Sequence, residues 1–228
     1  MKALAICSVL LFAITALPQT HKASKKGSTA GIDPESCDLS FAGTARKAVK
    51  LRTAQDGADY VKVNDGKPIT VEDWFAMTCK LDDQVPSKVP ASQAMKGIET
   101  QKVTLKGFLM GAKLDPDHDI HAEVAGSPKW ATPHLIVEVP PGQQYCAARK
   151  ALWDIVKTEL PAHSTSKIHV MKTPAPVTVT GYLFLYTAHG KTDFCHTRGG
   201  RGITPAGKKQ QVQGLWEIHP VLELQASE

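Results

Sequence analysis

The sequence predicts a mainly β protein with one helix inserted among five strands. Apolar and polar residues alternate with period two in five separate stretches of residues 98–228, which is typical of strands with one buried face. One stretch with helical spacing lies between the third and the fourth of them. The order β-β-β-α-β-β is that of an OB-fold-like five-stranded Greek-key barrel, although a small α+β sandwich would give the same order.

Each predicted element has its own signal. The β-branched and aromatic content of the five stretches supports strands, and they cover residues 103–110, 119–124, 134–139, 177–186 and 215–224. Gly107 lies inside the first strand, where a sharp bend would let one strand serve both halves of a barrel. Apolar residues recur at helical spacing over 143–160, and Pro161 ends that helix.

Residues 37–97 form a small N-terminal region before the barrel domain of residues 98–228. Residues 41–51 are consistent with a short helix. A second helix is expected to begin after Thr70, whose hydroxyl can cap it and which is followed by acidic residues, and to run to about Cys79.

The first twenty residues are typical of a signal peptide. Lys2 precedes an uncharged apolar run over 3–16, which is too short to cross a bilayer as a helix. Residues 21–36 are small, polar and basic, so we expect a flexible linker there. The protein is therefore expected to be secreted or periplasmic, with no stable membrane insertion after cleavage.

Export changes the interpretation of the cysteines. Four remain after removal of the signal peptide, so two disulfides are expected, and three pairings are open. We predict Cys146–Cys195, because the end of the third strand and the loop after the fourth meet at one end of an OB-like barrel. Cys37–Cys79 would then hold the N-terminal region to itself.

Charged and imidazole side chains share one face of the predicted strands. Alternation places Ile120, Leu135 and Ile218 and their neighbours on the core face, and the acidic residues and histidines on the opposite face. Carboxylates and imidazoles suit a divalent metal or a general acid–base pair. Solvated faces of antiparallel strands show the same pattern. The candidate catalytic residues are Asp119, His121, Glu138, Glu217, His219 and His189, and the candidate metal ligands are His121, His219 and Glu217. We further expect His121 and His219 to lie on neighbouring strands, with at least one of them hydrogen-bonded to a carboxylate.

A second candidate surface follows the fourth strand. Residues 187–214 are glycine-rich and basic, and the corresponding loop of OB-folds helps to bind oligonucleotides or oligosaccharides. Basic side chains there could contact phosphates, and aromatic rings along the fourth strand could stack on bases, although core packing explains the rings equally well. The candidate ligand-binding residues are Arg198, Arg201, Lys208, Lys209, Tyr182 and Tyr186.

Several segments resemble a family of secreted bacterial proteins. The family shares D-I-H, E-x-P, V-T-G-x-x-F, H-G and E-x-H-P-V segments in this order, which correspond here to 119–121, 138–140, 179–184, 189–190 and 217–221. The resemblance covers about residues 100–224 and implies a bacterial, extracytoplasmic setting. It supplies no reaction, and the Arg-Gly-rich loop before the last strand is longer here than in the common pattern.

Three functions remain open from the sequence. The leading hypothesis is a binding module for an anionic polymer, either single-stranded nucleic acid or an acidic glycan, because the element order is that of an OB-fold and the loop is basic. The alternative is a metal-assisted hydrolase such as a phosphodiesterase or nuclease, which would need a divalent cation. The third is a structural envelope protein without a ligand.

Overall fold

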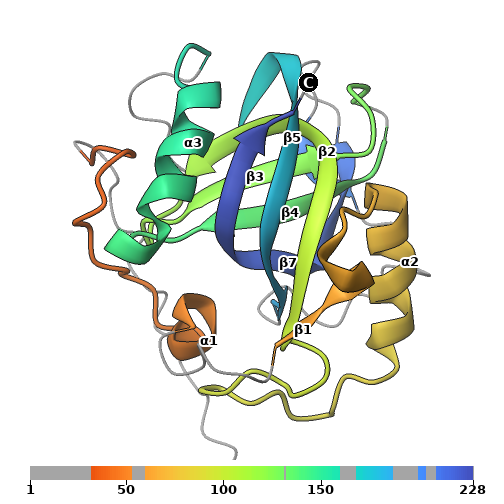
Figure 1. Ribbon diagram of the computed structural model, residues 1–228. Helices are drawn as coiled ribbons and strands as arrows, with labels where there is room; N and C mark the ends of the chain where they lie inside the picture. The colour runs from red at the N-terminus through yellow and green to blue at the C-terminus, as the bar shows by residue number, and fades with distance from the viewer. Residues whose placement is uncertain are drawn as a thin grey trace, which may run out of the picture.

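The protein is built around a closed barrel of five strands (Figure 1). A computed structural model describes residues 32–52, 60–130, 132–159, 168–186, 200–203 and 209–227, with the backbone alone for 200–203 and 209–214. The barrel strands are β2 (Gln101–Leu114), β3 (Ile120–Ala125), β4 (His134–Val139), β5 (His169–Leu185) and β7 (Lys209–Ala226).

The strand order confirms the predicted OB-like barrel. β2, β3 and β4 form an antiparallel meander, β7 pairs with β4 in parallel, and β5 pairs with both β7 and β2 to close the barrel. Helix α3 (Cys146–Val156) lies between β4 and β5, as expected, and follows the short 3-10 helix η2 (Gln143–Tyr145). The last strand therefore lies between β4 and β5.

Two strands begin well before their sequence signals. β5 begins at His169 and β7 at Lys209, well before the predicted starts. The short strand β6 (Gly200–Ile203) pairs with the beginning of β7, so part of the predicted 187–214 loop is strand. Glycine and lysine give no strand signal in this stretch, and the pairing itself selects the extended conformation there.

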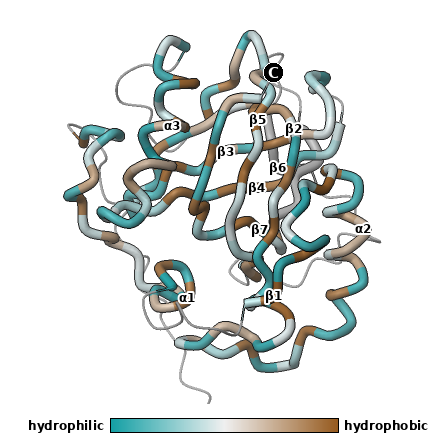
Figure 2. The backbone as a smooth tube through the Cα atoms, in the orientation of Figure 1, coloured by the Kyte–Doolittle hydropathy of each residue, from teal (hydrophilic) through white to brown (hydrophobic). Residues whose placement is uncertain are grey.

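The core face of the barrel follows the predicted alternation. The side chains of Ile120, Val124, Leu135, Val137 and Ile218 are at most 1% exposed and belong to one apolar cluster. Figure 2 shows hydrophobic segments along the barrel strands, interspersed with hydrophilic ones. Helix α3 adds apolar side chains to the same cluster, and α2 (Val71–Asp82) adds others.

Gly107 is required by a close approach inside β2. A Cβ atom at this position would lie 2.6 Å from a methyl group of Val124 and 2.8 Å from the carbonyl oxygen of Ala125. The shift of strand register in β2 lies slightly further on, between Leu109 and Gly111. Only a residue without a side chain lets β3 pack this closely against the strand.

The N-terminal region packs against the barrel. The hydroxyl of Thr70 accepts a hydrogen bond from the Asp73 amide and completes a capping box, so the predicted start of α2 is confirmed. Trp74 of α2 is fully buried in the barrel core. Three short elements complete the region: α1 (Lys47–Leu51), β1 (Val61–Lys62) and the 3-10 helix η1 (Val63–Gly66).

Helix α1 is shorter than the predicted helix over 41–51. Its two flanking residues, Arg46 and Arg52, have φ angles of 50° and 49°, which lie in the left-handed region. Such angles interrupt a right-handed helix on both sides. We refer to residues 37–52, which contain this helix, as the N-terminal strap.

The disulfide of the strap contradicts the predicted pairing. Cys37 is joined to Cys146 at the start of α3, with 5.2 Å between their Cα atoms. Both Cys146–Cys195 and Cys37–Cys79 are therefore wrong, because the residues before the strap run along α3 instead of folding back on their own region. Arg149 supports this path by donating hydrogen bonds to the carbonyl groups of Pro34 and Val139. Cys79 is also disulfide-bonded, and Cys195 lies outside the described residues.

The predicted signal peptide and most of the predicted linker lie outside the described residues. Within the described ranges, no helix is both long and apolar enough to cross a bilayer.

Candidate metal centre

The polar face of the barrel strands is buried. Asp119 and His219 are 0% exposed, Glu217 is 2% exposed and Glu138 is 5% exposed. These values rule out the alternative that the residues form an ordinary solvated strand face. The N-terminal strap covers them: the amide of Ala42 donates a hydrogen bond to the carbonyl group of Asp117, and Arg52 donates one to Leu183.

Glu138 is the central carboxylate of this face. It lies directly opposite His121 in the β3–β4 register, and Nδ1 of His121 is 2.8 Å from its Oε1 atom. Nδ1 of His219 lies 2.7 Å from the other oxygen, Oε2, but the ring N–H direction is poorly aligned with it. The predicted pairing of a histidine with a carboxylate is therefore confirmed. The two histidines are not on neighbouring strands, because β4 lies between β3 and β7 and carries Glu138.

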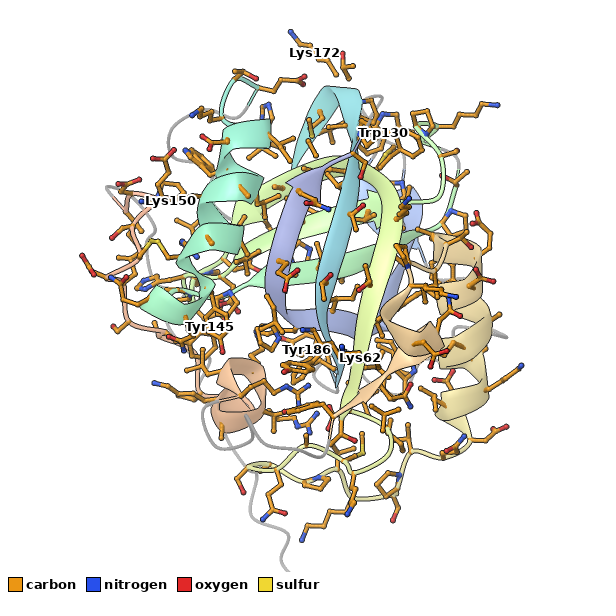
Figure 3. All side chains as sticks on the ribbon, in the orientation of Figure 1. Lys62, Trp130, Tyr145, Lys150, Lys172 and Tyr186 are labelled. Carbon is orange, nitrogen blue, oxygen red and sulfur yellow. A yellow bond between two sulfur atoms is a disulfide. The ribbon has the colours of Figure 1, made fainter. Side chains whose placement is uncertain are left out.

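A buried lysine of the strap occupies the middle of the carboxylates. Nζ of Lys50 lies 3.3 Å from Glu138, 3.3 Å from Asp117 and 3.4 Å from Asp119. The rings of Phe41 and Tyr186 lie 5.6 and 5.5 Å from the same ammonium group. Tyr186, labelled in Figure 3, lies at the end of the barrel that faces α1.

A cavity of about 330 Å³ opens beside this lysine. The side chains of Lys113, Asp115 and Asp117 are about a fifth to a quarter exposed and form its mouth. Glu138 and Glu217 lie deeper and are almost fully buried. The cavity has the size of a small-molecule site, and its lining consists of Lys50, Lys113, Asp115, Pro116, Asp117, His121, Glu138, Tyr186 and Glu217.

Burial and charge separate the pKa values of these carboxyl groups. Burial acts to raise the pKa of Glu138, but Lys50 and the two histidines outweigh it and hold the pKa well below its ordinary value. Burial, and then the charge of Glu138, raise the pKa of Glu217 well above its ordinary value. Burial likewise raises the pKa of Asp119, against the opposing effect of Lys50. Glu138 is therefore ionised, whereas its neighbours Glu217 and Asp119 resist ionisation.

The basic groups respond to the same surroundings. Burial alone would lower the pKa of Lys50, but Glu138, Asp119 and Asp117 raise it above its ordinary value. Burial, and then the charge of Lys50, lower the pKa of His219 to about 4, so this imidazole is neutral at physiological pH. Neutral imidazole is the form that binds metals.

Two groups of donor atoms have the spacing of metal ligands. Asp115, His121 and Glu138 form the outer cluster, and Asp119, Glu138 and His219 form the inner cluster. Within each cluster the donor atoms lie within 4.8 Å of one another. An ion at about 2.4 Å from each of two donors can span that separation. Glu138 belongs to both clusters.

Glu217 has an atom that no described residue satisfies. Its Oε2 is buried without a hydrogen-bond partner among the described residues, and the side chain lines the cavity. Such an atom costs free energy unless a ligand, ion or water contacts it. Together with the outer cluster, it makes the cavity suitable for a cation.

The structure unites five of the six candidate catalytic residues. Asp119, His121, Glu138, Glu217 and His219 share the buried face, while His189 lies outside the described residues. The predicted metal ligands His121 and His219 contact opposite oxygens of Glu138. Their proposed catalytic and ligand roles stay predictions.

The candidate residues for binding an anionic polymer are mostly outside the described structure. Arg198 and Lys208 lie beyond it, and Arg201 and Lys209 are described only as backbone in β6 and β7. Tyr182 is buried, with the ring of Tyr60 stacked at 4.1 Å and Arg52 5.3 Å away. Tyr186 lines the acidic cavity beside Lys50.

Sequence reasoning missed four residues of the site. Asp115 and Asp117 stand in the run 115–119, whose three aspartates in five residues are a visible signal for an acidic turn. Lys113 precedes that turn and forms an ion pair of 2.6 Å with Asp115. Lys50 carries no such signal, because only the folded strap places it among carboxylates that lie 67 to 88 residues away.

Replacing Glu217 by glutamine is expected to stabilise the metal-free protein in a pH-dependent way. The unfolded carboxyl group releases its proton above its ordinary pKa of 4.5, whereas the folded one retains it. The folded state then binds more protons, so wild-type stability falls as pH rises through that range. The thermal midpoints of Glu217→Gln and wild type should coincide near pH 4 and diverge in favour of the variant toward pH 8. A difference that is constant with pH would contradict the raised pKa.

No family model, curated protein or solved structure matches the chain. Its function is therefore argued from the geometry of the site.

Proposed function

We propose that this chain is an exported protein that binds a divalent metal ion in its acidic cavity. The outer cluster of Asp115, His121 and Glu138 would supply the ligands, with Glu217 as an additional carboxylate. The Cys37–Cys146 disulfide supports export, because structural disulfides persist mainly in oxidising compartments.

The observation that carries the proposal is the unsatisfied carboxylate of Glu217 in a cavity already short of positive charge. The cavity is lined by four carboxylates, those of Asp115, Asp117, Glu138 and Glu217, but by only two lysines. Carboxylates confined at this spacing repel one another unless protons or cations intervene. A divalent ion supplies that charge and a contact for Glu217 at the same time.

The donor set favours a transition metal. Mixed imidazole and carboxylate ligands suit Zn²⁺ and Mn²⁺ better than Mg²⁺, which binds mainly carboxylates and water. A metal held in this cavity would supply Lewis-acid chemistry, which keeps metal-assisted hydrolysis as the reaction class to examine.

Binding of an anionic polymer stays a prediction for the basic loop. The acidic cavity does not favour it, because carboxylates repel phosphate and sulfate groups. The four basic residues that would bind such a polymer carry no described side chains.

We expect the purified wild-type protein, stripped with chelator, to bind one Zn²⁺ or Mn²⁺ ion per chain in isothermal titration calorimetry. Glu217→Gln should weaken that affinity by about tenfold or more, because losing a ligand or its close electrostatic support has effects of this order. Both proteins should show the thermal midpoint rise that metal binding to the folded state produces, smaller in the variant.

The matched control is Glu223→Gln. Glu223 lies on the same strand, β7, but is exposed and outside the cavity. Its metal affinity should equal that of wild type. A wild-type chain that binds none of Zn²⁺, Mn²⁺ and Ca²⁺ would contradict the proposal and favour the structural envelope protein.

A further inference from the structure

Lys50 holds the position of a cation in the inner cluster. Its side chain is only 6% exposed, and its ammonium faces Asp117, Asp119 and Glu138. The three N–O distances are 3.3–3.4 Å. Charge-assisted hydrogen bonds of this type are usually about 2.7–2.9 Å long. The ammonium is therefore centred among the oxygens without forming a close bond to any of them.

The inner cluster contains donor atoms that Lys50 does not satisfy. Oδ1 of Asp119 and both ring nitrogens of His219 are buried without an aligned hydrogen-bond partner among the described residues. Both residues are 0% exposed, so bulk water does not reach them. The Lys50 ammonium donates its hydrogen bonds to Asp117, Asp119 and Glu138, and none of them reaches a ring nitrogen of His219. A metal ion would bind the imidazole and the carboxylates together.

Glu138 connects the two clusters through different oxygens. Its Oε1 faces His121 of the outer cluster, and its Oε2 faces Lys50 and His219 of the inner cluster. Two-metal sites hold their ions about 3.5–4 Å apart. A carboxylate with one oxygen directed at each position has the arrangement that such a bridge requires.

We propose, resting on the metal site proposed above, that the cavity is a carboxylate-bridged two-cation site whose inner position is taken by the Lys50 ammonium. The wild-type chain binds one divalent ion in the outer cluster. When the ammonium is removed, the inner cluster of Asp119, Glu138 and His219 takes a second divalent ion.

The test counts metal ions in Lys50→Met and Lys47→Met. Methionine keeps an unbranched apolar stem like that of lysine and lacks the ammonium group. Lys47 is the matched control because it lies on the same helix and its Nζ contacts the carbonyl oxygen of Phe41, with no carboxylate within ion-pair distance among the described residues. Each protein is stripped with chelator and titrated with Mn²⁺, and bound metal is measured by elemental analysis and calorimetry.

Wild type and Lys47→Met are expected to bind one ion, and Lys50→Met two. The electron paramagnetic resonance spectrum of bound Mn²⁺ should show isolated ions in wild type and an exchange-coupled pair in Lys50→Met. Adding Asp119→Asn to Lys50→Met should return the count to one, since it removes a ligand of the inner cluster alone.

The two proposals fail in different ways. One ion in wild type and one in Lys50→Met overturns the inference and leaves the metal site standing. If wild type binds no ion, the proposed function is overturned. If Lys50→Met also binds no ion, the inference is overturned as well. If Lys50→Met does not fold, Lys50→Gln is measured in its place. Independently of any variant, an exchange-coupled Mn²⁺ pair in the wild-type protein overturns the inference.

Discussion

Glu138→Ala is expected to lower the free energy of unfolding by about 3–5 kcal/mol, the usual cost of removing one partner from a buried ionic group. The substitution withdraws the nearest anion from Lys50 and the partners of two buried imidazoles. The surroundings of Glu138 lower its pKa strongly, so it is a charge, and not a neutral acid, that is lost. Urea denaturation followed by circular dichroism measures the change.

Glu123→Ala is the matched control for this substitution. Glu123 is equally buried on the neighbouring strand β3, but its described polar contact is a single one, a 2.8 Å hydrogen bond with His134. Its loss should cost about 1–3 kcal/mol, as for one unsatisfied buried group. Equal losses in the two variants would show that Glu138 does not hold the buried charges together.

Removing the Cys37–Cys146 disulfide is the second substitution with a large expected effect. The bond joins residues that are 109 positions apart. The loop-entropy relation gives about 4.7 kcal/mol for a loop of roughly 100 residues. Cys37→Ser/Cys146→Ser should lose stability of this order, measured by urea denaturation under non-reducing conditions so that the disulfide of Cys79 stays intact.

The double variant should also release the N-terminal strap. Limited trypsin digestion should cut after Lys47 and Lys50 faster than in wild type, because the ammonium of Lys50 is buried only while the strap is seated. Ser36→Ala serves as the control, since it changes the same segment and keeps the disulfide. If the double variant loses less than about 1 kcal/mol in free energy of unfolding and trypsin cleaves it at the wild-type rate, the disulfide does not hold the strap. Side-chain contacts, such as that of Arg46 with Glu99, would then hold it alone.

The barrel and half of the site could be predicted because both depend on local pattern. Period-two alternation separates Ile120 from His121 and Val137 from Glu138 wherever the strand runs in space. The element order then restricts the topology to a few arrangements. The sequence therefore identifies the polar residues that share one face. It does not indicate whether that face is exposed to solvent or buried.

The rest depends on contacts between distant segments, which leave no local signal. Nothing near Lys50 indicates three carboxylates, and nothing near Cys37 distinguishes Cys146 from the other cysteines. The helix predicted over 41–51 shows the same limit. Its composition suits a helix, but Arg46 leaves the helical region where its guanidinium contacts Glu99 and the carbonyl group of Leu185.

The position of the strap in the chain has a consequence for the order of assembly. The strap is synthesised before the barrel, yet its anchors are Glu138, Cys146 and Leu183, which follow their partners in the strap by 88, 109 and 131 residues. Contacts this far apart carry a high loop-closure cost until the intervening chain is folded. We therefore expect the strap to be the last segment to settle, and the proposed metal site would be enclosed at that final step.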